Sequence, residues 1–164
     1  MTAQEDALAQ ITAFLEHAGV PYMVIGGIAN LIWGEPRATI DIDITVLVPP
    51  ERIETFVVSV AAQFKVLVDD PAVFVRDTRV LPAAAPSGVR IDLVFGLLPF
   101  EEEAVRRAAS VEAAGRTIRV CTPEDLILMK VISERDRDLS DARAIVMRRF
   151  PELDLGYLEP RIER

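Results

Sequence analysis

The sequence predicts an α/β (α+β) domain in which helices flank a mixed β-sheet. Amphipathic segments at helical spacing alternate with short β-branched runs, most clearly over 39–48 and 89–95. The chain has 164 residues, 51% of them hydrophobic, which is enough for one compact core. It contains no internal repeat, low-complexity tract or obvious linker. We therefore expect one domain over 1–164, with a core at about 20–120 and a helical part at about 122–150.

The first third of the chain carries the sharpest element boundaries. Residues 3–17 predict a helix, because their apolar residues recur at helical spacing, and Gly19-Val20-Pro21 would end it. An apolar strand at 22–25 leads into Gly26-Gly27 and a brief helix at 28–33. The clearest strand is 39–48, which Pro49-Pro50 closes.

The remaining elements are predicted from turn residues and helix caps. In order they are a helix at 51–63, strands near 64–68, 72–76 and 89–95, a hairpin loop at 82–88, a helix at 99–108, a hairpin of 110–113 with 116–120 through Ala114-Gly115, a helix from Pro123 to about Glu134 and another from about Asp138. Thr122 is the predicted N-cap of the helix at Pro123, with Asp125 as its capping-box acid.

Composition excludes several classes of protein. One cysteine, Cys121, and one histidine, His17, leave no internal disulfide, no cysteine zinc site and no cluster of histidine ligands. No apolar run approaches 18 residues, and Glu5 and Asp6 replace the basic start of a signal peptide, so we expect a cytoplasmic protein without a membrane partner.

The charge distribution is uneven. The net charge of −8 argues against a protein that coats nucleic acid. Residues 101–164, however, hold 12 basic and 14 acidic side chains, against 6 and 12 in residues 1–100. The later arginines form either a local site for an anionic partner or simply the solvated face of an amphipathic helix.

Three aspartates stand out because of their positions on predicted strands. Asp41 and Asp43 lie two apart, so both side chains share one face, while the isoleucines at 40, 42 and 44 face a core. Asp92 interrupts the apolar run Val89-Arg90-Ile91-Asp92-Leu93-Val94-Phe95. Adjacent carboxylates repel unless a cation lies between them, and oxygen ligands select hard ions such as Mg²⁺. If the two strands are neighbours, the three acids can hold two metals.

Each of these features also has a plain structural explanation. Asp41 and Asp43 fit the solvent face of an edge strand, and Asp92 fits a capped or salt-bridged acid. The Gly26-Gly27 pair between a strand and a helix offers backbone N–H groups to a phosphate, although glycines end strands everywhere. The pair matches neither the dinucleotide-binding fingerprint nor a P-loop.

The order of these features resembles the DNA polymerase β-like nucleotidyltransferase superfamily, whose signature is a glycine pair, an Asp-x-Asp and a third distant carboxylate. GGIANLIWGEPRATIDIDI is most similar to small bacterial proteins related to abortive-infection toxins (AbiEii-type), matching their pattern at Ala29, Gly34, Arg37 and Thr39. LILMKVISERDRDLSDARAIV supplies the later Lys130, Arg137, Asp138 and Asp141 of that group. The resemblance runs from about residue 20 to 148.

The resemblance implies a nucleotidyltransferase fold and an NTP-dependent enzyme that moves an NMP to a hydroxyl and releases pyrophosphate. Asp41, Asp43 and Asp92 would be catalytic and would ligate two Mg²⁺ or Mn²⁺ ions. The nucleotide-binding residues would be Gly26, Gly27, Arg37, Thr39, Lys130 and Asp138. Lys130 would contact the triphosphate or position Asp138, and its alternative is a surface lysine on an amphipathic helix.

The resemblance leaves the acceptor open among tRNA, a protein and a small molecule. It includes the toxin of a toxin–antitoxin pair, with an antitoxin protein as partner. The alternative function is a catalytically silent nucleotide-binding or protein-interaction module with the same fold. A metal-dependent phosphohydrolase is a third class, although this chain lacks the histidine-rich ligands that such sites often use.

Overall fold

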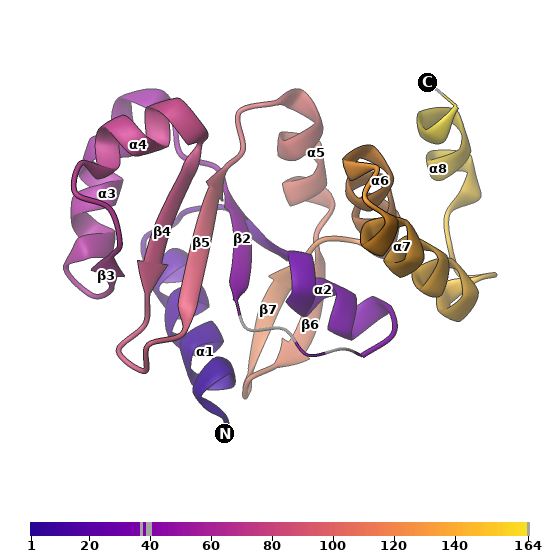
Figure 1. The fold of residues 1–164 in the computed structure, drawn as a ribbon, viewed down its shortest axis with the longest axis horizontal. Helices are drawn as coiled ribbons and strands as arrows, with labels where there is room; N and C mark the ends of the chain where they lie inside the picture. Colours follow the sequence, from indigo (N-terminus) through magenta and orange to yellow (C-terminus); the bar gives the residue numbers. More distant parts are fainter. Residues whose placement is uncertain (37, 39–40, 164) are drawn as a thin grey trace.

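The computed structural model describes residues 1–36, 38 and 41–163, which contain a seven-stranded mixed sheet in the order β3-β4-β5-β2-β1-β7-β6 (Figure 1). Its strands are β1 (Tyr22–Ile25), β2 (Ile42–Val46), β3 (Lys65–Val66), β4 (Val80–Ala84), β5 (Arg90–Phe95), β6 (Ala109–Ala113) and β7 (Arg116–Val120). Strand β2 runs parallel to β5 and antiparallel to β1, and β1 pairs with β7 in parallel. The α/β class predicted from the sequence is confirmed.

Helices flank this sheet. They are α1 (Ala3–His17), α2 (Gly26–Trp33), the 3-10 turn η1 (Pro50–Arg52), α3 (Ile53–Ala61), α4 (Pro71–Thr78), α5 (Pro99–Arg107), α6 (Pro123–Ser133), α7 (Asp136–Arg149) and α8 (Leu155–Ile162). Helices α6, α7 and α8 gather beyond α2, at one side of the molecule (Figure 1). Within the described ranges, no helix has the length and apolar character needed to cross a membrane.

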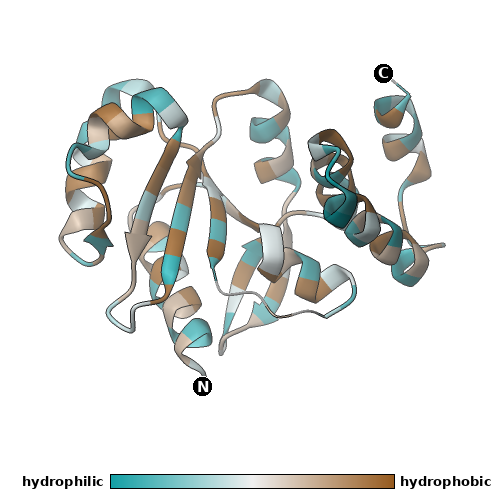
Figure 2. Ribbon diagram, viewed as in Figure 1, coloured by the Kyte–Doolittle hydropathy of each residue, from teal (hydrophilic) through white to brown (hydrophobic). Residues whose placement is uncertain are grey.

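The core lies beneath the central strands. Ile42, Ile44, Ile91 and Leu93 are completely buried, whereas Arg90 is exposed. Along β5 hydrophilic residues alternate with hydrophobic ones, which Figure 2 shows as alternating teal and brown segments. One face of these strands therefore packs against the interior, and the other face is left for polar side chains.

The predicted elements near the start of the chain are confirmed, with two differences at their boundaries. Helix α2 begins at Gly26 rather than at residue 28. Strand β2 covers 42–46, so that Asp41 lies immediately before the strand and not on it. Residues 37, 39 and 40 of the predicted strand and its approach are outside the described ranges.

The predicted strand at 72–76 is wrong, because this segment belongs to helix α4. Asp70 caps that helix by accepting a hydrogen bond from the Val73 amide, and Pro71 occupies the first turn. The apolar run at 72–75 resembles a strand only if this cap is overlooked. Besides β2, β5 pairs with β4, whose second half, Pro82–Ala84, falls within the segment predicted as a hairpin loop.

Three further details of the C-terminal part differ from expectation. Helix α7 begins at Asp136, two residues early, and α8 had not been predicted. Thr122 does cap α6, but the Asp125 side chain does not complete a capping box. Instead, the fully buried Asp125 carboxylate accepts hydrogen bonds from Tyr157 of α8 and from Arg107 of α5. This buried polar contact attaches the last helix to the rest of the molecule.

The end of α2 is held by residues from later in the chain. Arg149 of α7 donates to the carbonyls of Trp33 and Ile32 at 3.1 and 2.9 Å, and its guanidinium stacks over the Trp33 ring. Trp33 in turn donates through Nε1 to the Cys121 carbonyl at 2.8 Å. These bonds supply partners for carbonyls at the C-terminus of α2, which the helix itself leaves unpaired.

Candidate active site

The central strands bring two of the three predicted acids together. Asp43 of β2 is in register with Asp92 of the parallel strand β5 and, on its other side, with Ile25 at the end of β1. Neighbouring strands lie about 4.8 Å apart, so the side chains of residues paired in this way share one face. Asp43 and Asp92 are both half-buried, and Asp41 lies two residues before Asp43.

The electrostatics of Asp43 show that these carboxylates affect one another. Burial, followed by repulsion from Asp92 and from Asp41, raises the pKa of Asp43 from 3.8 to about 6. Arg90 opposes this shift, and its Nε donates to Asp92 Oδ1 at 3.1 Å. The site is therefore a cluster of negative charge, part of which Arg90 offsets.

The glycine turn lies directly against Asp43. Gly26 has a φ of +63°, and a Cβ atom at this position would come within 2.4 Å of Asp43 Oδ2. Both the left-handed conformation and the close approach require glycine. Gly27 follows in the first turn of α2, so the start of this helix and the Asp43 carboxylate form one continuous surface. The predicted association of the glycine pair with the acids is therefore present in the fold.

The donor chemistry of this cluster fits a divalent cation. Its side chains offer only carboxylate oxygens, which are the ligands that Mg²⁺ and Mn²⁺ prefer, and the repulsion that raises the pKa of Asp43 is what a cation would relieve. Within the described ranges, no group of three or more acidic, histidine or cysteine side chains is already arranged around a metal position. Asp92 is instead turned to Arg90.

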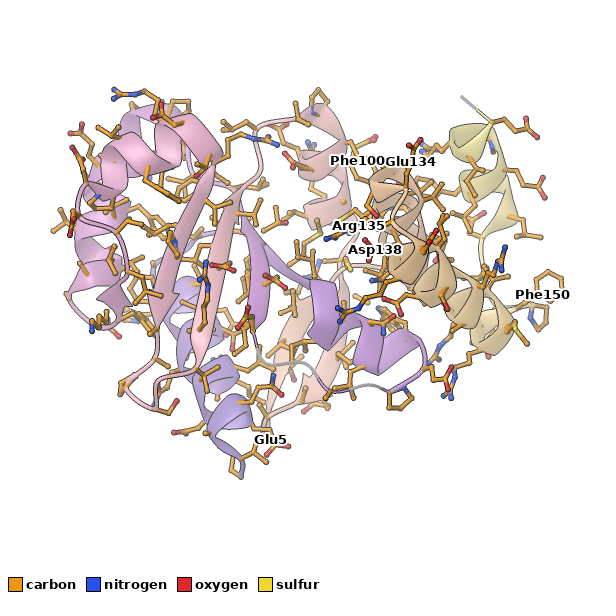
Figure 3. All side chains as sticks on the ribbon, viewed as in Figure 1. Glu5, Phe100, Glu134, Arg135, Asp138 and Phe150 are labelled. Atoms are coloured by element: carbon orange, nitrogen blue, oxygen red, sulfur yellow. The ribbon has the colours of Figure 1, made fainter. Side chains whose placement is uncertain are left out.

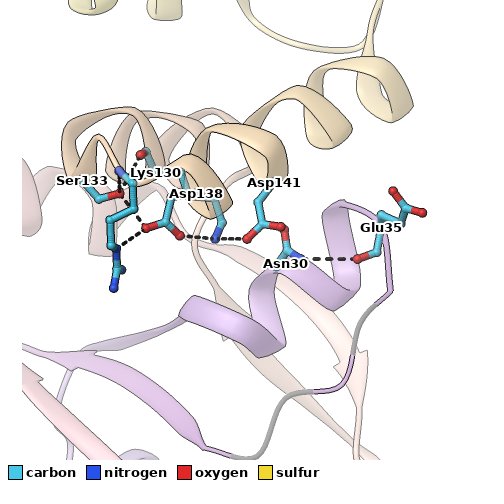
Figure 4. Close-up of polar contacts among 7 residues, drawn as sticks. Asn30, Glu35, Lys130, Ser133, Asp138 and Asp141 are labelled. Carbon is cyan, nitrogen blue, oxygen red and sulfur yellow. Dashed lines mark hydrogen bonds and ion pairs between the residues drawn. The ribbon is translucent and has the colours of Figure 1, made fainter.

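A second polar cluster lies where α6 meets α7. Asp138 Oδ2 accepts from Ser133 Oγ at 2.6 Å and from Arg135 Nε at 2.8 Å, while Asp138 Oδ1 accepts from Lys130 Nζ at 3.4 Å. Lys130 also donates to Asp141 Oδ2 at 3.0 Å. Figure 4 draws this cluster next to α2, the helix against which α6 and α7 both pack.

Lys130 is not a surface lysine, because its side chain is only 7% exposed and lies between two carboxylates. Partial burial by itself would raise the pKa of Asp138. The hydrogen bond from Ser133 and the contacts of Lys130 and Arg135 outweigh that effect, so the pKa of Asp138 falls below its ordinary value. Asp138 is thus held as a carboxylate that accepts hydrogen bonds.

The structure shows some residues that the sequence had not singled out. Arg90, Ser133 and Arg135 all contact predicted site residues. Arg90 had a signal, because it stands two residues before Asp92 on the same face of a strand. Ser133 had none, and Arg135 stood out only as one of the later arginines that could form a local site for an anionic partner. The contacts of both residues depend on how α6 turns into α7. Arg37 and Thr39, predicted to bind the nucleotide, lie outside the described residues.

The comparison with families of known sequence decides the class of the protein. The family model described as "Nucleotidyl transferase of unknown function (DUF2204)" matches residues 4–159. The chain belongs to this family. It is accordingly a nucleotidyl transferase, and no curated protein sequence matches it.

Solved structures share the fold of this nucleotidyl transferase. ANT(2")-Ia in complex with adenylyl-2"-tobramycin is 18% identical, with a TM-score of 0.63 over 99% of this chain and 96% of that one. The lincomycin-bound lincosamide antibiotic adenylyltransferase LnuA is 16% identical, with a TM-score of 0.59 over 88% and 96%. An antigenic nucleotidyltransferase-like protein from Paracoccidioides brasiliensis is 17% identical, with a TM-score of 0.60 over 96% and 86%. At these identities, the likeness shows the fold alone.

Proposed function

We propose that this nucleotidyl transferase moves an NMP from an NTP to a hydroxyl acceptor, using Asp41, Asp43 and Asp92 as its catalytic acids. The observation that carries the proposal is the register of β1, β2 and β5. It sets Asp43 beside Asp92 and sets the Gly26 turn against the same carboxylate. A phosphate-binding backbone next to paired carboxylates suits phosphoryl transfer, which depends on positioning and on stabilising charge.

Each part of this arrangement has a role in the proposed reaction. The amides at the start of α2, around Gly26 and Gly27, face the phosphates and stabilise the negative charge that develops on the departing pyrophosphate. Asp92 accepts the proton of the attacking hydroxyl. The half-buried position of Asp43 and Asp92 restricts water around the reacting phosphorus, which strengthens these charge interactions.

Metal dependence is part of the proposal. Asp41, Asp43 and Asp92 would hold Mg²⁺ or Mn²⁺, with Asp92 released from Arg90. Cations held there would neutralise the phosphates and would lower the pKa of the acceptor hydroxyl. The raised pKa of Asp43 reflects repulsion from the neighbouring carboxylates, which a bound cation would relieve. This supports the assignment.

We propose a small hydroxylated molecule as the acceptor, in preference to tRNA or a protein. The similar structures titled as complexes with adenylyl-2"-tobramycin and lincomycin support the choice, as does the net charge of −8, which disfavours a large RNA footprint. The AbiEii-type relationship and a toxin role with an antitoxin partner rest on the sequence resemblance. A cytoplasmic location is proposed from the composition of the chain and not from that resemblance.

The test is a transfer assay with each α-³²P-labelled NTP, Mg²⁺ or Mn²⁺, and separate pools of small hydroxylated antibiotics, cellular RNA and cellular protein. We expect label in the small-molecule pool and none with Asp43→Asn. The matched control is Asp77→Asn, which removes an exposed carboxylate from α4. Label in the RNA or protein pool would reassign the acceptor. A protein that binds NTP but transfers no label to any pool would be the silent module.

A further inference from the structure

One exposed arginine stands out in the cluster between α6 and α7. Arg135 precedes the first residue of α7, and its side chain is 79% exposed, whereas those of Lys130 and Asp138 are 7% and 11% exposed. Figure 3 places Arg135 and Asp138 on the side of α6 and α7 that faces the sheet. Within this cluster, Arg135 is thus the accessible cation, and Lys130 is the buried one.

Lys130 already donates hydrogen bonds to partners within the protein. Its ammonium donates to Asp138 and to Asp141, and it lies in the interior. A phosphate that drew this ammonium away would break its ion pairs with two partly buried carboxylates, Asp138 and Asp141, which is unfavourable. Lys130 therefore acts on Asp138 and Asp141, not on an incoming anion.

Arg135 has the opposite situation. Its Nε is bound to Asp138, which fixes the plane of the guanidinium. Its two terminal Nη groups make no hydrogen bond to any residue in the described ranges, and the exposure of the side chain leaves them accessible. A guanidinium tethered in this way presents a fork of N–H donors whose geometry matches two oxygens of a phosphate.

The position of Arg135 relative to the acids is also fixed. Helices α6 and α7 pack on α2, whose first residues form the glycine turn against Asp43. At the other end of α2, Arg149 of α7 binds the carbonyls of Ile32 and Trp33. Because α7 is held along α2 in this way, the N-terminus of α7 cannot move freely away from the glycine turn.

We infer that Arg135 binds the triphosphate of the donor nucleotide, with Lys130, Ser133 and Asp138 as positioning residues that aim its guanidinium. The inference rests on the proposed function, because it assumes that an NTP occupies the space between the acids and α7. The family resemblance implies Lys130 as a triphosphate contact, whereas this inference assigns that contact to Arg135, five positions later.

The test is calorimetric titration of the whole protein with inorganic triphosphate and Mg²⁺, a probe that needs no choice of base. We expect Arg135→Ala to weaken binding about tenfold to a hundredfold, the range for a lost charged hydrogen bond. Arg135→Lys should recover part of this loss, because a lysine keeps the charge but not the fork. Arg76→Ala removes an equally charged, exposed arginine from α4 and should bind as the wild type does.

A thermal melt of each variant separates binding from folding. Arg135→Ala should melt within about 2 °C of Arg76→Ala, since exposed side chains contribute little to stability. Weaker binding with an unchanged melting temperature supports the inference. Unchanged triphosphate binding by Arg135→Ala, alongside lost binding by Asp43→Asn, would overturn the inference and leave the proposed function standing. A wild type that binds neither inorganic triphosphate nor any NTP would overturn both.

Discussion

At the scale of single residues, the candidate site is defined by unfavourable interactions that the fold tolerates. Asp43 lies near Asp41 and Asp92 and against the Gly26 turn, and its pKa is raised to about 6. A carboxylate that is partly buried and repelled by its neighbours lowers the stability of the folded protein when it is charged. Such residues are common at functional sites and rare elsewhere. The cost at Asp43 can be measured directly.

Removing the charge of Asp43 should stabilise the metal-free protein above pH 6. Because its pKa is raised in the folded state, the folded protein binds this proton more tightly than the unfolded chain. The contribution of Asp43 to stability therefore falls as the pH rises from about 4 to about 6, and it is then constant. After allowance for solvent screening, Asp43→Asn should gain about 1–2 kcal/mol over wild type at pH 7.5.

Urea unfolding in EDTA between pH 4 and pH 8 checks this expectation. The difference between Asp43→Asn and wild type should widen across the pH window and then level off. Asp77→Asn, on the exposed face of α4, should show no such widening. A difference that is the same at pH 4 and pH 7.5 would show that Asp43 is not under electrostatic strain.

Gly26 can be tested against another glycine with a similar backbone. Gly19 has a φ of +68° with nothing near its missing Cβ, whereas a Cβ at Gly26, with its φ of +63°, would meet the Asp43 carboxylate. Both alanine variants should lose about 1–2 kcal/mol from the left-handed conformation. Only Gly26→Ala should also abolish Mg²⁺-dependent nucleotide binding, measured by calorimetry. Equal binding losses in the two variants would exclude a specific role for the turn.

At the scale of elements, the last helix is fastened by one buried polar contact. Tyr157 donates to Asp125, the Arg107 and Arg161 guanidinium groups lie over its ring, and Arg107 also donates to Asp125. Burial, together with Asp125, raises the pKa of Tyr157 to about 12, so its hydroxyl stays protonated and keeps donating at any physiological pH. The Tyr157 hydroxyl therefore remains a donor that attaches α8 to Asp125.

Tyr157→Phe should loosen α8 without changing the core. The change removes one donor from a fully buried carboxylate, which costs about 1–3 kcal/mol. Tyr22→Phe is the comparison, because its hydroxyl donates to a Glu16 carboxylate that solvent can still reach, and its loss should be smaller. Urea unfolding gives both values. Hydrogen exchange should accelerate in α8 for Tyr157→Phe, and protection equal to that of wild type would contradict the anchoring role.

At the scale of the whole molecule, the C-terminal helices and the sheet share their contacts. Arg149 and Trp33 join α7, α2 and the start of α6, while Asp125 joins α5, α6 and α8. We expect such a molecule to unfold as one cooperative unit. In scanning calorimetry, the calorimetric and van't Hoff enthalpies should agree. Two separate transitions, one of them lost when residues 122–164 are removed, would show that the helical part is an independent unit.

The sequence predicted much of the architecture because its strongest signals are local. The alternation around Ile42 and Ile44 and the caps at Thr122 and Pro123 each act within a few residues, and the structure bears them out. The error at 72–76 arose where a cap at Asp70 outweighed an apolar run. The partners of Lys130 and Asp125 were beyond prediction in detail, because they depend on how helices distant in the sequence pack.

The candidate site was predictable to the extent that it follows strand order. The register of three strands brings a glycine pair, Asp43 and Asp92 together. Residue type and spacing singled these residues out, but their proximity was predicted only on the condition that the two acid-bearing strands are neighbours. The effect of Arg90 on Asp43, in contrast, depends on β2 and β5 being adjacent in the sheet. The exposure of Arg135 and the burial of Lys130 depend on the turn between α6 and α7, where Glu134 adopts a left-handed conformation that the sequence does not announce.

The capping of α2 by Arg149 has a consequence for dissecting this protein. The helix that starts at the glycine turn is only about 12 Å long, and its final carbonyls depend on a residue more than a hundred positions further along the chain. A fragment cut after β7 would keep every acid of the site yet lose the donors that close α2. The shortest fragment that keeps the end of α2 paired therefore extends past Arg149. In a series of C-terminal truncations, we expect folding to be lost abruptly once Arg149 is removed, and not gradually with length.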